Sequence, residues 1–162
     1  MLSTKLVHRI EDQWEQISGR FFRLLRSSQE VPHIAAIPES ALNEMCRRIL
    51  RNLGDWLVSG SESEIAWYYE KIGADRHRQG IPLSEAIRAL QFMKNSTISF
   101  IQDEIRIENT VDLYAEEELE NRLGKFFDLL IFHLARGYES AIAAKEKHDA
   151  IAAKVLHTSA GH

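Results

Sequence analysis

The chain has 162 residues, enough for one domain that buries a hydrophobic core without disulfides or metal ions. Hydrophobic residues make up 44% of it and charged residues 27%, as is usual for globular proteins. The net charge is −4 and both signs are mixed along the chain, which excludes the basic surface that nucleic-acid binding requires.

The sequence shows no sign of secretion or membrane insertion. Its N-terminal residues are charged, unlike a signal peptide, and no segment approaches the roughly 20 apolar residues of a membrane span. The single cysteine, Cys46, excludes an internal disulfide framework, and its helical spacing from Leu42 and Ile49 predicts a buried, reduced thiol. We therefore expect a cytoplasmic protein.

Apolar residues recur at the helical period along almost the whole chain, and no segment alternates as a strand would. The pattern predicts an all-α bundle of about five helices. The first covers Leu6–Leu25 and ends in an irregular connection that contains two prolines. The second begins at Pro38 and Glu39, because proline suits the start of a helix and glutamate its first turn.

The next two helices are separated by a turn. The short third helix follows Gly60, with Ser61 or Ser63 as its N-cap. Gly80 is expected to adopt a positive φ at its end, and Pro82 to stop it and begin the fourth helix.

The fifth helix is predicted to be unusually long. Residues 111–157 contain no proline and only two isolated glycines, Gly124 and Gly137. A helix of about 45 residues is on the order of 65 Å long, against ~30–40 Å for the other long helices. One end should therefore project beyond the bundle, unless the helix kinks at Gly137.

Composition favours the projection. Up to Tyr138 the inward face of this helix is bulky, whereas beyond it the apolar stripe thins and alternates with lysines. The residues of this thin stripe are Ala141, Ala144, Ile151, Ala152 and Val155. Such a stripe is typical of a contact between two helices or of the start of a linker. We expect residues 1–138 to form the bundle and residues 139–162 to form a homodimerising, signalling helix with a frayed tail.

One histidine suggests chemistry. The stretch HLARGYESA places Arg136 three and Gly137 four positions after His133, and it resembles the His-x-x-Lys-Gly pattern of histidine phosphotransfer domains. That resemblance implies a phosphoacceptor at His133, a cation at Arg136 that supports the phosphoryl group, and space at Gly137 for a receiver. Arginine replaces the lysine of the pattern. The alternative is a histidine at the margin of the apolar stripe.

Two other chemistries remain open. An all-helical chain of this length could hold haem in a globin-like fold, with His133 or His77 as the iron ligand, but an ordinary aromatic core has the same pattern. The acidic run Glu116–Glu118 with Glu120 suits a cation or the positive end of the helix dipole. Neither a metal-site spacing nor a catalytic constellation is present, so we expect a non-catalytic protein without metal.

The stretch YYEKIGADRHRQGIPLSEAIRAL, residues 68–90, resembles the core of RsbR co-antagonist type N-terminal domains. The matching features are an aromatic residue before Ile72-Gly73, a cation before a glycine, and the Ile-Pro-Leu-x-Glu run. The candidate site residues among them are Tyr69, Arg76, Gly80, Pro82 and Glu85. A second match lies in FFDLLIFHLARGYESA, at Phe126-Phe127-Asp128 and Gly137-Tyr138, and the resemblance covers most of residues 5–140.

Members of that family are helical sensor modules found ahead of histidine kinase or anti-sigma-antagonist output domains. The resemblance implies a bacterial signal-transduction module, in a two-component or stress-response system, that receives a signal through a ligand or a protein contact. Its C-terminal helix would pass the signal to a partner protein or a fused output domain. The turn is either structural or a contact site, and Arg76 and Glu85 flank it closely enough to pair. No output domain follows Tyr138, so we expect an excised module or a stand-alone protein.

Overall fold

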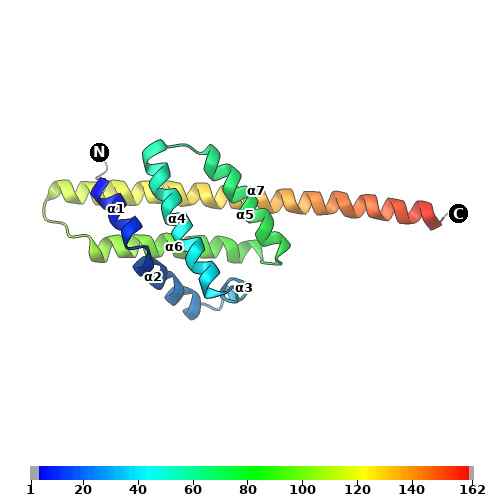
Figure 1. The fold of residues 1–162 in the computed structure, drawn as a ribbon, viewed down its shortest axis with the longest axis horizontal. Helices are drawn as coiled ribbons and strands as arrows, with labels where there is room; N and C mark the ends of the chain where they lie inside the picture. The colour runs from blue at the N-terminus through cyan, green and yellow to red at the C-terminus, as the bar shows by residue number, and fades with distance from the viewer. Residues whose placement is uncertain (1–3, 161–162) are drawn as a thin grey trace.

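The computed structural model describes residues 4–160, and within that range the chain forms seven helices and no strand. The predicted all-α fold with a long, projecting C-terminal helix is confirmed (Figure 1). The helices are α1 (Thr4–Asp12), α2 (Trp14–Ser27), α3 (Pro32–Ala35), α4 (Glu39–Ser59), α5 (Ser63–Arg78), α6 (Leu83–Glu104) and α7 (Thr110–Ala160).

The stripe predicted as one first helix is divided between α1 and α2. Gln13, which separates them, has φ −107° and ψ 29°, outside the helical region. Ile10 on α1 and Ile17 on α2 are nevertheless both buried. The apolar spacing continues across the break, so the periodicity could not reveal it. The predicted irregular connection also contains the single-turn helix α3, which begins at Pro32.

Local residues explain where the other helices begin and end. Gly60 is the C-cap of α4, and its φ of 65° is rarely adopted by residues with a Cβ. The predicted serine caps of α5 are wrong, because Ser63 is already helical and Glu62 takes the N-cap position. Asn109 caps α7: its Oδ1 accepts a hydrogen bond from the backbone N–H of Asp112 at 2.9 Å.

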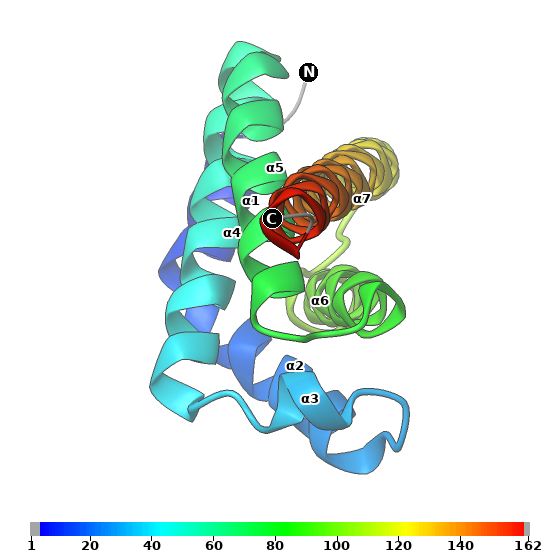
Figure 2. The same cartoon turned by 90° about the vertical axis from the view of Figure 1, so that its right-hand side faces the viewer.

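Two long helices form the axis of the molecule. α6 and α7 lie side by side and antiparallel, and α5 crosses α7 (Figure 1). Seen along α7, helices α1, α4 and α5 stand to one side of this pair, and α2 packs against both α4 and α6 (Figure 2). The core between the helices is mostly aliphatic, and its largest fully buried side chains are the rings of Phe21, Phe100, Phe126 and Phe127.

Two glycines bring α5 and α7 almost into backbone contact. A Cβ at Gly73 would lie 2.1 Å from the carbonyl oxygen of Leu134, and one at Gly137 would lie 2.1 Å from the carbonyl oxygen of Glu70. Both distances are far below van der Waals contact, so neither position accepts a side chain at this helix separation. Gly137 therefore serves the crossing rather than a bend, because α7 continues through it without interruption.

The second half of α7 extends away from the bundle (Figure 1). At 1.5 Å per residue the whole helix is about 75 Å long. Its buried positions end at Tyr138, and from Glu139 to Ser159 every side chain is exposed except the half-buried Ala141. Within residues 4–160, no helix combines the length and apolar character needed to cross a membrane.

Cys46 is buried in the core, as predicted. Burial raises the pKa of its thiol from 9.0 to about 12, because a thiolate would lose its hydration there. Since the thiolate is the reactive form, this cysteine is chemically inert in the folded protein.

The glycine crossing predicts opposite effects of alanine at two glycines of α7. Gly137→Ala should destabilise the fold by about 1–3 kcal/mol, because the methyl group meets backbone atoms that cannot rotate away. Gly124→Ala is the matched control, since a Cβ there meets no atom within 4 Å. It should stabilise the fold by up to about 1 kcal/mol through helix propensity.

Urea unfolding followed by circular dichroism measures the free energy of unfolding of both variants. A Gly137→Ala protein as stable as the Gly124→Ala protein would contradict the close packing of α5 on α7.

Candidate functional site

The turn between α5 and α6 has the geometry predicted from its glycine and proline. Gly80 has φ 77°, and its N–H donates to the carbonyl of His77. The N–H of Ile81 donates to the carbonyl of Arg76 at 3.1 Å. These two bonds form a Schellman motif, which satisfies the last carbonyls of α5. Pro82 occupies the N-cap position of α6.

Glu85 does not pair with Arg76, contrary to the expectation from their positions at the turn. It is only 4% exposed, and its Oε1 accepts hydrogen bonds from the backbone N–H groups of His33 at 2.7 Å and Ile34 at 3.3 Å. Its Oε2 contacts Nδ1 of the His33 ring. Glu85 therefore caps the N-terminus of α3 from a different helix, which explains why a carboxylate is buried there.

Tyr138 on α7 holds the turn from the other side. Its ring is 2% exposed, and its hydroxyl donates a hydrogen bond to the carbonyl of Ile81 at 2.9 Å. Burial raises the pKa of this hydroxyl to about 12. The bond joins the two separate stretches on which the family resemblance rests. Sequence reasoning missed it, and its only local signal was an aromatic side chain with a polar tip on a buried stripe.

The residues of the phosphotransfer hypothesis lie at the α5–α7 crossing. His133 is 5% exposed, with its Nε2 3.0 Å from Oε1 of Glu62 and its Nδ1 3.7 Å from Oε2 of Glu70. Nε of Arg136 is 3.5 Å from Oε1 of Glu70. Gly137 faces α5 instead of solvent. A phosphoacceptor has to enter a receiver's active site, so this geometry does not favour the hypothesis, which stays a prediction.

The acidic run lies beyond the first turn of α7, so it does not serve the positive end of the helix dipole. Asp112 occupies that first turn. Glu116 is buried, and burial together with the neighbouring charges of Glu120 and Glu117 raises its pKa. No group of three potential metal ligands occurs within residues 4–160.

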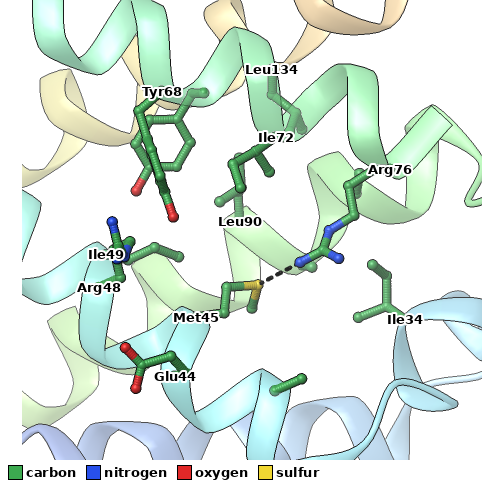
Figure 3. A pocket seen from close by; sticks show the side chains of 14 residues that line it. Ile34, Glu44, Met45, Arg48, Ile49, Tyr68, Ile72, Arg76, Leu90 and Leu134 are labelled. Carbon is green, nitrogen blue, oxygen red and sulfur yellow. Dashed lines mark hydrogen bonds between the residues drawn. The ribbon is translucent and has the colours of Figure 1, made fainter. Parts of the chain in front are cut away.

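A cavity of about 200 Å³ lies between α4, α5 and α6, with α3 and α7 contributing to its walls (Figure 3). Most of its lining is apolar, and the charged groups come from α4 and α5. The lining side chains labelled in Figure 3 are Ile34, Glu44, Met45, Arg48, Ile49, Tyr68, Ile72, Arg76, Leu90 and Leu134. A concave apolar site with a few polar groups is the usual form of a small-molecule binding site.

Two of the predicted motif residues belong to this cavity, and three do not. Tyr69 and Arg76 line it, whereas Gly80, Pro82 and Glu85 build the neighbouring turn. Tyr69 is 3% exposed; burial raises the pKa of its hydroxyl, which accepts a hydrogen bond from Nδ2 of Asn52 at 3.1 Å.

The haem hypothesis gains no support from this cavity. Neither His77 nor His133 lines it. The ring of His77 instead packs edge-on against Tyr138, with 5.8 Å between centroids, and that of His133 packs against Phe132.

α5 connects the cavity to the projecting helix. Tyr68, Tyr69, Ile72 and Arg76 on one face of α5 line the cavity. Gly73, four residues after Tyr69 and three before Arg76, lies at the edge of this face and against the backbone of α7. Any displacement of α5 at the cavity must therefore displace α7 or open the crossing, because no side chain lies between the two backbones to absorb it.

Comparison with known protein families identifies a match. A model of the family described as "RsbT co-antagonist protein rsbRD N-terminal domain" matches residues 15–150. This range includes the cavity, the turn and the α5–α7 crossing. No curated protein and no solved structure matches the chain.

The Tyr138 contact predicts a specific loss of stability. Tyr138→Phe should lower the free energy of unfolding by about 1–3 kcal/mol, because the buried carbonyl of Ile81 would lose its side-chain donor. Tyr114→Phe removes the same atom from an exposed tyrosine at the start of α7, and should change stability by less than about 0.5 kcal/mol. Thermal and urea unfolding compare the two, and equal effects would show that the hydrogen bond is unimportant.

Proposed function

The chain belongs to the family of the RsbT co-antagonist protein rsbRD N-terminal domain, a family of stress-signalling sensor domains, and from this premise we propose how it transmits a signal. A signal received at the cavity displaces α5. The glycine crossing passes this displacement to α7, and the projecting half of α7 presents it to an output protein or domain. The chain itself performs no catalysis.

The observation that carries this proposal is the double role of α5. Its residues Tyr69 and Ile72 line the cavity, and Gly73, the next residue, lies against α7. Packed helices usually shift by 1–2 Å when they switch state. A shift of that size at the crossing moves a rigid helix along its whole length, so the exposed end of α7 reports events at a site inside the bundle.

The output surface is the exposed stripe of α7 beyond Tyr138. Ile151 and Val155 are 56% and 59% exposed, and Ala141, Ala144 and Ala152 continue the stripe along the helix. We propose that two copies pair along it, since small and β-branched residues at helical spacing suit a two-helix contact. The displaced pair of α7 helices would then act on a histidine kinase or an anti-sigma antagonist.

Charge on this stripe should abolish pairing. Replacing Ile151 and Val155 together by aspartate places like charges across the contact, and should convert a dimer into a monomer. The control replaces Ala150 and Ala153 by aspartate, because these residues lie about 100° or more around the helix from the first two. Light scattering over a dilution series measures the mass. A parent protein that is monomeric throughout, or a stripe variant that still dimerises, would refute pairing.

Filling the cavity should mimic the signal. Ala89 on α6 is 4% exposed and lines the cavity, so Ala89→Leu places a larger side chain inside it. We expect the distance between the bundle and the end of α7 to change by about 1–2 Å. The control, Ala35→Leu, adds the same atoms at an exposed position of α3.

Spin labels at introduced cysteines, Arg23→Cys on α2 and Lys147→Cys on α7, report this distance by pulsed electron paramagnetic resonance. The buried Cys46 need not be removed, because its side chain is fully enclosed by the core and a labelling reagent does not reach it. Labelled protein is diluted with unlabelled protein so that only distances within one chain are seen. An unchanged distance in folded Ala89→Leu protein would refute the transmission, and Ala86→Val serves as a second filling variant if the first does not fold.

A further inference from the structure

The cavity has the size of a small organic molecule. Its volume is about 200 Å³, whereas an engineered cavity of about 150 Å³ in another protein holds benzene. The space therefore suits a ring, or a chain of similar volume, with two or three further atoms.

The interior of the cavity selects for an apolar body. Ile49, Ile72, Leu90 and Leu134 converge on it from α4, α5, α6 and α7 (Figure 3). A molecule that is polar all round would leave its hydrogen-bonding groups unpaired against these side chains, at a considerable cost in free energy.

The charged groups of the cavity select for a negative charge. Arg48 and Arg76 contribute two guanidinium groups, against the single carboxylate of Glu44. Among the residues that the structure describes, neither arginine forms an ion pair: Arg76 contacts Oε1 of Gln79 and Sδ of Met45, and Arg48 lies over the ring of Tyr68.

The two guanidinium groups reach the cavity from different helices (Figure 3). Arg48 on α4 lies over the ring of Tyr68, and Arg76 on α5 lies against Met45. Burial raises the pKa of the Tyr68 hydroxyl, and the positive charges of Arg48 and Arg76 oppose this shift. An anion in the cavity therefore meets guanidinium groups that are able to donate hydrogen bonds and that, within residues 4–160, are not already paired with a carboxylate.

We propose that the cavity binds a small monocarboxylic acid with an apolar body about the size of a phenyl ring. The carboxylate lies at Arg76, Arg48 adds a second positive charge to the same cavity, and the apolar body lies among Ile49, Ile72 and Leu134. The inference rests on the proposed function in one respect, because that function makes this cavity the place where the signal enters. The inference adds the chemical class of the signal, which is a small organic acid.

Three probes of similar size test the assignment of charge. Calorimetric titration of the full chain compares benzoate with its neutral amide, benzamide, and with the cation benzylamine. The carboxylate should bind at least about tenfold more tightly than the amide, because charge-assisted bonds to guanidinium are lost in the amide. The amine should not bind. Equal binding of acid and amide, or no binding of the acid, would overturn the proposal.

Two substitutions with opposite expected effects on affinity test whether the ligand lies in the cavity. Arg76→Gln should weaken binding of the acid about tenfold or more and leave the amide unaffected. Glu44→Gln should tighten binding of the acid about two- to fivefold, since it removes a repelling charge at the rim. A gain of affinity cannot result from damage to the fold. Arg106→Gln, at an exposed position after α6, removes one positive charge elsewhere and should have no effect.

Unchanged acid affinity in both Arg76→Gln and Glu44→Gln would place the ligand outside this cavity and refute the inference. Arg76→Lys replaces Arg76→Gln if the latter fails to fold, and it should retain part of the affinity for the acid. Failure of the proposed function looks different: the acid would bind as described without changing the spin-label distance between α2 and α7. A distance that responds to Ala89→Leu in a protein that binds no acid would refute only the ligand assignment.

Discussion

The close crossing of α5 and α7 is the constraint on which the rest of the structure depends. It exists because Gly73 and Gly137 lack side chains, so that the carbonyls of Leu134 and Glu70 occupy the space where Cβ atoms would lie. The turn after α5 can reach Tyr138 only at this helix separation. The same separation sets how deeply Leu134 enters the wall of the cavity.

Buried polar contacts fix the surroundings of this crossing. Glu85 caps α3 from α6, and Tyr138 binds the carbonyl of Ile81 from α7, so the turn and the start of α6 are tied to segments distant in sequence. Each contact satisfies a buried backbone group that would otherwise cost about 1–3 kcal/mol. The turn is therefore a rigid support beside the cavity.

The sequence determined the helical architecture. Apolar spacing, Gly80, Pro82 and the proline-free stretch after Asn109 predicted the helices, the turn and the long final helix. These features depend on the backbone preferences of neighbouring residues, which a sequence states directly. Apolar periodicity cannot detect every helix end. The helix breaks at Gln13, but the apolar stripe continues across the break, so the sequence pattern did not predict it.

Only the tertiary structure decided which residues meet. The sequence indicated a phosphotransfer pattern at His133 and Gly137, but α5 covers both residues in the folded chain. The sequence also suggested that Arg76 pairs with Glu85, whereas Glu85 binds the start of α3. The cavity was equally hidden, although Tyr69 and Arg76 had been singled out. Its walls come from five helices, and their juxtaposition follows from packing between residues far apart in the chain, which local sequence preferences do not encode.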